Sequence, residues 1–148
     1  LPSSFIVDSI AFANGQFVVV GFGKGIYTSA DGISWTTQAT ANPNFPELKS
    51  VIYDGSQFIT VGGTVFGSSA PPLIMTSPDG VNWTTRSWTV PQNQPETQLN
   101  DIAIAGGKLT AVGANGTIIS STDSGLTWSS ESQINNNTTF RIKFYKDK

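Results

Sequence analysis

Apolar residues in this chain form short runs, and the runs follow one another in the same order three times. The first run of each set has the pattern apolar-x-apolar and is followed by a turn dipeptide such as Asn14-Gly15. The second run ends in Val-Gly. The spacing is identical from Ile10 to Gly21, from Val51 to Gly62 and from Ile102 to Gly113. Short strands joined by tight turns are what such runs predict.

The second run of each set is apolar without alternation, as in Phe17-Val18-Val19-Val20. A strand that is covered on both faces has this composition, whereas a strand with one wet face alternates. The third run, for example Ile26-Tyr27-Thr28, leads into another turn, and a fourth strand is expected after Trp35. Four short strands per unit, each unit packed between neighbours, are typical of the blades of a propeller.

The turn before the fourth strand contains a Ser, an Asp, a Gly and a Trp in the same order in all three units, with one extra residue in the third. We expect its Asp to accept hydrogen bonds from backbone amides of its own turn and its Gly to take a positive φ angle. The Trp that ends the turn supplies apolar surface under the hairpin. We therefore expect a structural role for Ser29, Asp31, Gly32, Trp35, Ser77, Asp79, Gly80, Trp83, Ser121, Asp123, Gly125 and Trp128.

This turn resembles the Asp-box, or BNR-type repeat, of sialidase-like β-propellers, in which the box lies away from the active site. The resemblance covers the boxes and the blade pattern over nearly the whole chain. Sialidases also need an arginine cluster and a Tyr-Glu pair, and this chain has only Arg86 and Arg141 as arginines. The repeats are similar to those of bacterial surface proteins and phage tail or receptor-binding proteins. A photosystem assembly factor with similar repeats is a poorer match, because its arginine patch is missing.

The predicted fold is all-β, a single propeller segment over residues 1–148 made of blades with four antiparallel strands. Three full blades are expected at about residues 5–39, 48–88 and 99–132, with the first strand of a fourth at about 140–148. Propellers typically close with more blades than this. Because an uncovered blade face leaves apolar surface in water, we expect further blades of the same polypeptide, or identical chains, as partners.

Composition excludes several functions. Only 12% of residues are charged, the formal net charge is −2, and there is no His and no Cys. Nucleic acid is not an expected partner because Lys and Arg do not cluster, and membrane insertion is not expected because no apolar run approaches about 20 residues. Nucleophile chemistry of the Ser-His or Cys-His kind is excluded within the chain. We expect no metal and no cofactor.

A glycosidase would need two carboxylates on either side of the scissile bond. Asp8 and Asp101 precede first strands, which line the central channel of a propeller, and they are the best available pair. Polar residues at that position also commonly solvate the channel. We expect no catalysis, and the glycoside hydrolase or sialidase-like alternative depends on these two residues.

Binding is the more favoured role, because the variable connections share one face of an up-and-down blade and the invariant turns share the other. An aromatic ring beside amide side chains suits a sugar or a protein hot spot. The candidate ligand contacts in the variable connections are Trp88, Phe66, Phe45, Gln92, Asn93 and Gln94. The alternative for Trp88 and Phe45 is that they cap gaps between blades.

The sequence thus predicts a non-catalytic binding or assembly module of the extracellular space, a cell surface or a virion such as a phage tail. Its expected ligand is a glycan or a cell-surface protein receptor. Two alternatives stay open: a glycoside hydrolase fragment, and a purely structural subunit that assembles with itself.

Overall fold

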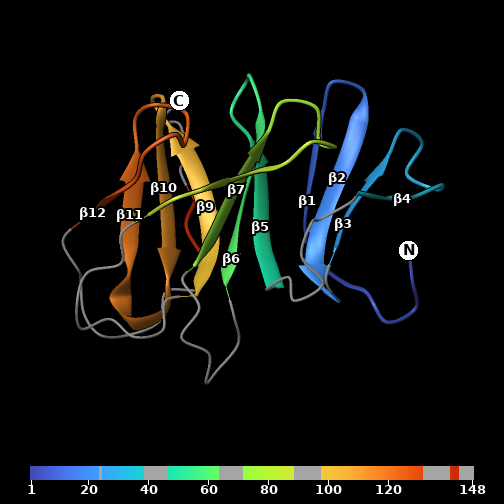
Figure 1. Ribbon diagram of the computed structural model, residues 1–148, viewed down its shortest axis with the longest axis horizontal. Helices are drawn as coiled ribbons and strands as arrows, with labels where there is room; N and C mark the ends of the chain where they lie inside the picture. Colours follow the sequence, from blue (N-terminus) through green and yellow to red (C-terminus); the bar gives the residue numbers. More distant parts are fainter. Residues whose placement is uncertain (24, 39–46, 64–71, 89–97, 132–140, 144–148) are drawn as a thin grey trace.

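The computed structural model describes residues 1–23, 25–38, 47–63, 72–88, 98–131 and 141–143. It contains three antiparallel sheets of four strands, each built from one sequence repeat with its strands in chain order (Figure 1). A 3-10 turn at Ala114–Gly116 is the only helical element among the described residues. The predicted all-β fold of four-stranded blades is confirmed, and the molecule is a partial β-propeller.

The strands are as follows. The first blade contains β1 (Ile6–Ala13), β2 (Gln16–Phe22), β3 (Gly25–Ser29) and β4 (Thr36–Gln38). The second contains β5 (Glu47–Tyr53), β6 (Phe58–Gly63), β7 (Leu73–Ser77) and β8 (Thr84–Arg86). The third contains β9 (Leu99–Ala105), β10 (Lys108–Gly113), β11 (Ile118–Ser121) and β12 (Ser129–Ser130).

Of the residues in the predicted fourth-blade strand, the structure describes only 141–143. Residues 141–143 belong to no strand, and the rest of the range 140–148 lies outside the described residues. None of the described residues belongs to a helix with the length and hydrophobicity needed to span a lipid bilayer.

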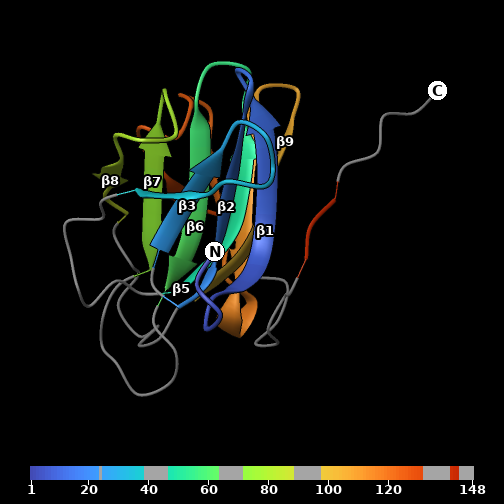
Figure 2. The ribbon, with the colours of Figure 1, turned by 90° about the vertical axis from the view of Figure 1, so that its right-hand side faces the viewer.

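The first strands of the blades lie next to one another. β1 contacts β5, and β5 contacts β9. Figure 2 shows these three strands along one side of the molecule and β8 on the other. Both kinds of invariant turn, the hairpin after each first strand and the turn before each fourth strand, lie at the upper end in Figure 1. The first strands therefore form an inner surface, and they begin at the end opposite the invariant turns.

The hydrophobic core lies between blades rather than within them. The layer between the first two blades combines Val18, Val20 and Ile26 with residues of the second blade such as Val51 and Phe58. An equivalent layer joins the second and third blades. Every residue of β6 is buried. Because successive strand residues point to opposite faces, both faces of β6 are covered. Burial on both faces is what its continuous apolar composition predicts.

The glycine that ends each second strand has a packing reason. Opposite it, the first strand shifts register, as between Leu48 and Ser50. A Cβ added to Gly62 would fall far inside contact distance of the Glu47 carbonyl oxygen. The same clash would occur in the other blades, between Gly21 and the Ile6 carbonyl and between Gly113 and the Gln98 carbonyl. Only glycine lets the two backbones approach this closely.

The Asp of each turn before the fourth strand binds that turn together. In the first blade, Asp31 Oδ1 accepts hydrogen bonds from the backbone amides of Ile33 and Ser34, both at 2.8 Å. In the second, Asp79 Oδ1 accepts from the amides of Val81 at 2.9 Å and Asn82 at 2.8 Å.

The third turn has one more residue, and its Asp123 accepts from the Thr127 amide at 2.9 Å. The turn glycines have φ angles of 73°, 71° and 80° at Gly32, Gly80 and Gly125. The expected turn chemistry is therefore present in all three blades.

These hydrogen bonds lower the pKa of the three carboxyls. The amide of Ile33, followed by that of Ser34, lowers the pKa of Asp31 from 3.8 to about 2. The hydroxyl and the amide of Thr127 lower the pKa of Asp123 to about 2. The pKa of Asp79 is lowered further, first by the amide of Asn82. Each amide donor favours the ionised form of the carboxyl.

We predict that Gly62→Ala lowers the free energy of unfolding by about 3 kcal/mol, because β5 and β6 must separate to admit the methyl group. The matched control is Gly106→Ala, in a turn with φ +56° and no atom within 4 Å of the added Cβ. The control should cost only about 1 kcal/mol, for its left-handed backbone. Urea unfolding measures both, and equal losses would contradict the packing explanation.

We also predict an acid-sensitive stability. A carboxyl whose pKa is lower in the folded state stabilises the fold above its unfolded pKa near 4, and this contribution is lost as pH falls through about 2. Asp31→Asn keeps an acceptor oxygen but removes the titration. Unfolding of this variant should therefore take up about one proton fewer between pH 4 and pH 2. Melting temperature against pH gives the slope, and an unchanged slope would refute the assignment.

Candidate functional site

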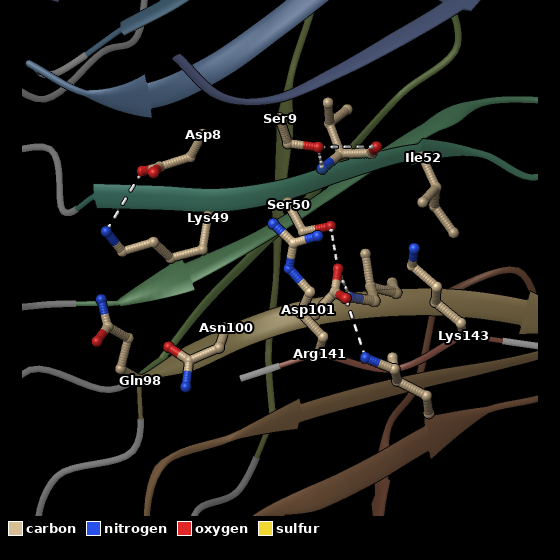
Figure 3. A pocket seen from close by; sticks show the side chains of 13 residues that line it. Asp8, Ser9, Lys49, Ser50, Ile52, Gln98, Asn100, Asp101, Arg141 and Lys143 are labelled. Atoms are coloured by element: carbon tan, nitrogen blue, oxygen red, sulfur yellow. Dashed lines mark hydrogen bonds and ion pairs between the residues drawn. The ribbon is translucent and has the colours of Figure 1, made fainter. Parts of the chain in front are cut away.

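A cavity of about 610 Å³ lies on the inner surface where the first strands begin (Figure 3). All three blades contribute to it, so the site exists only because the blades pack side by side. It is near the strand ends opposite the invariant turns. Its wall is formed by Asp8, Ser9, Lys49, Ser50, Val51, Ile52, Gln98, Asn100, Asp101, Ile102, Arg141, Ile142 and Lys143.

One repeat position in this wall ties each blade to the next. Ser9 Oγ accepts a hydrogen bond from the Val51 amide at 3.1 Å. Ser50, the equivalent of Ser9, donates its hydroxyl proton to Asp101 Oδ1 at 2.7 Å. Asp101, the third equivalent, accepts from the Ile142 amide through Oδ2 at 3.0 Å. Polar contacts along the cavity wall therefore link the first blade to the second, the second to the third, and the third to Ile142.

Residue 142 stands in a repeat-like position. Its amide binds the Asp101 carboxylate as the amide of Val51, a first-strand residue, binds the hydroxyl of Ser9. The sequence aligns Ile142 with Ile102 and Val51 as the apolar residue that opens a blade. Relative to the third blade, Ile142 thus lies where the first strand of a next blade would lie.

Some charged groups of the cavity wall form ion pairs, and others form none among the described residues. Lys49 Nζ pairs with Glu47 at 2.7 Å and, across the blade boundary, with Asp8 at 3.3 Å. Burial acts to lower the pKa of Lys49, but the two carboxylates outweigh it and leave that pKa raised. Arg141 and Lys143 have no ion pair within the described ranges. Figure 3 shows both cationic side chains at the cavity.

The two carboxylates that the sequence pairs for hydrolysis, Asp8 and Asp101, do line the same cavity. Both oxygens of Asp101 are already acceptors, from Ser50, from Ile142 and from its neighbour Ile102 at 3.0 Å. A general acid must carry a proton on one of its oxygens. In this arrangement the Asp101 carboxylate acts as a hydrogen-bond acceptor that links structural elements.

Gln98 contributes an unsatisfied donor to the wall. Its Nε2 is buried and has no hydrogen-bond partner among the residues that the structure describes. An unpaired buried amide carries a free-energy cost. Sequence reasoning missed Gln98 and Lys49, although they lie beside the repeat position shared by Ser9, Ser50 and Asp101, which a closer comparison of the blades could have found.

Of the predicted ligand contacts, only Trp88 lies in the described part of the chain. Its ring is half-buried and packs against the apolar layer between the second and third blades. That is the gap-capping position. The other predicted contacts, Phe45, Phe66, Gln92, Asn93 and Gln94, lie outside the described residues.

No family model and no curated protein matches this chain. Its fold is similar to that of several solved β-propeller-like proteins. The structure of YCF48 bound to a D1 peptide gives a TM-score of 0.71 at 20% identity, covering 93% of this chain and 43% of that one. For YCF48 from Cyanidioschyzon merolae the values are 0.63, 21%, 88% and 38%.

A glycoside hydrolase has the same fold. The GH32 β-fructofuranosidase of Bombyx mori gives a TM-score of 0.60 at 15% identity, over 88% of this chain and 35% of that enzyme. At such identities these likenesses establish the propeller fold alone. The chain spans 43% or less of the length of each of these three proteins.

We predict that Trp88→Ala lowers the free energy of unfolding by about 2 kcal/mol, since it removes half-buried aromatic surface from the layer between two blades. Trp88→Phe keeps a ring in the gap and should lose less than half as much. Thermal unfolding measures both variants. Unchanged stability in Trp88→Ala would rule out the gap-capping role.

Proposed function

We propose that this chain is a non-catalytic binding module that holds a segment of a partner protein in the cavity where β1, β5 and β9 begin. The observation that carries the proposal is a cavity of about 610 Å³ walled by three blades, with charges of both signs at fixed positions. This volume is in the range of known ligand sites. The likeness to YCF48, whose structure holds a D1 peptide, supports the same use of the fold.

The chemistry of the wall favours a peptide over a neutral sugar. A peptide offers carboxylates to Arg141 and Lys143, whereas a neutral sugar has no charge to pair with them. Sugar sites commonly present an aromatic face, and no aromatic residue is among the described residues of the wall. A protein segment therefore fits the cavity better than a neutral glycan.

The non-catalytic part of the proposal rests on Asp101. Its hydrogen bonds to Ser50 and Ile142 engage both carboxylate oxygens. Asp8 is held by Lys49. These contacts support a structural use of both carboxylates. The resemblance of the repeats to bacterial surface and phage tail proteins leads us to place this binding role in the extracellular space, at a cell surface or on a virion.

The test is an array of random peptides probed with the intact chain. We predict that it binds a subset of peptides, and that Arg141→Ala with Lys143→Ala weakens this binding about tenfold or more, because charge-assisted hydrogen bonds are lost. Lys108→Ala is the matched control. Lys108 pairs with Glu131 at 2.8 Å and is not part of the wall.

Two results would overturn the proposal. One is specific binding on a glycan array with none on the peptide array. The other is hydrolysis of a chromogenic glycoside that is abolished by Asp8→Asn, which would establish the hydrolase alternative.

A further inference from the structure

Among the described residues, one face of the first blade has no other blade beside it. Ala11 and Ala13 of β1 pack on the layer shared with the second blade. Ile10 and Phe12 alternate with them and therefore lie on the other face, the front face, which is directed away from the second blade. Figure 2 shows the first blade nearest the viewer.

The side chains of Ile10 and Phe12 are 54% and 59% exposed. The side chain of Val7, at the register shift of β1, is also exposed, at 44%. The residues equivalent to Ile10 in the other blades, Val51 and Ile102, are only 3% and 2% exposed. The sequence repeats the apolar position, but only two of its three copies are buried.

The preceding blade is what covers the two buried copies. The layer around Val51 is completed by the back face of the first blade, and the layer around Ile102 by the back face of the second. The first blade uses Ala11, Val18, Val20 and Ile26 for this purpose. The second blade uses Ile52, Ile59, Val61 and Ile74.

The third blade carries the same kind of back face. At the equivalent positions it has Ala103, Thr110, Val112 and Ile118, three of which are identical to those of the first blade. Ala103, Thr110 and Ile118 are only partly buried. Val112 is only 3% exposed. Among the described residues, the third blade repeats the back half of the interface, and the first blade repeats the front half, without another blade beside either of them.

The N-terminal segment covers only part of the open front face. Phe5 packs on Val19 and Tyr27, with its ring 4.6 Å from that of Tyr27. Residues of the inner strand are left in water, among them Ile10 and Phe12. Burial of such a surface is favourable, and the surface has the residue pattern of a blade interface.

We propose that the front face of the first blade binds the back face of the third blade of a second copy of this chain, head to tail. The occupant follows from complementarity, because the two faces repeat the pairing of the first blade with the second. In the complex, β1 of the second copy takes the place of residues 141–143 beside Asp101. Arg141 and Lys143 would then leave the cavity wall, so association of two copies and the proposed peptide binding would compete with each other.

The test compares the mass in solution of the whole chain with that of two single variants. The unmodified chain should exceed the 15.7 kDa of one copy as its concentration rises from about 1 µM to about 100 µM. Ile10→Lys places a charge in the proposed interface and should weaken association about tenfold or more. The control is Ile33→Lys, at a residue 82% exposed in an invariant turn, which should associate normally.

A mixture makes the test specific for head-to-tail pairing. Thr110→Lys blocks the back face and leaves the front face intact, whereas Ile10→Lys does the reverse. Each variant alone should stay at the mass of one chain, and an equimolar mixture should form a dimer. At about 1 µM, where the parent chain is also largely dissociated, the variants should melt at the temperature of the parent chain. A monomeric parent chain at all concentrations, association that survives Ile10→Lys, or a mixture that stays monomeric would overturn the proposal.

Discussion

Face-to-face packing of short-stranded sheets is the constraint on which this structure depends. A blade of four short strands presents roughly 300 Å² per face, and leaving one face in water forfeits about 7 kcal/mol. A single blade is not stable under that cost, since a whole domain has only about 5–15 kcal/mol of net stability. The chain therefore buries its second strands between neighbours, so that β6 is enclosed along its whole length.

Close stacking of the blades is possible because each blade has the same internal geometry. The glycine at the end of the second strand lets the backbone of the first strand approach it at a register shift. The turn aspartate accepts hydrogen bonds from backbone amides of other residues in its turn, and these bonds fix the backbone conformation that leads into the fourth strand. Local features that repeat in sequence thus produce sheets of one shape, and sheets of one shape can share a common interface.

The cavity is a consequence of this stacking rather than a feature of one blade. Each first strand places a polar residue at its inner end, and stacking makes these residues neighbours across blade boundaries. Some of them then become structural, as when Asp101 accepts from Ser50 and Ile142. Arg141 and Lys143, by contrast, line the cavity without an ion pair among the described residues. The repeat position of Ser9, Ser50 and Asp101 therefore both links neighbouring blades and lines the proposed binding site.

The sequence by itself determined the local structure: the strands, their order within each blade, the turn hydrogen bonds and the residues that face a neighbouring blade. Each of these features depends on contacts within one repeat. The same pattern of residues occurs in all three repeats, which makes it recognisable in the sequence. Only the tertiary structure decided which side chains meet across blades, because Lys49 and Asp8, like Ser50 and Asp101, are distant in sequence and come together through stacking. It also decided which repeated apolar residues are buried, since Ile10 and Ile102 read alike and differ only in having a blade beside them.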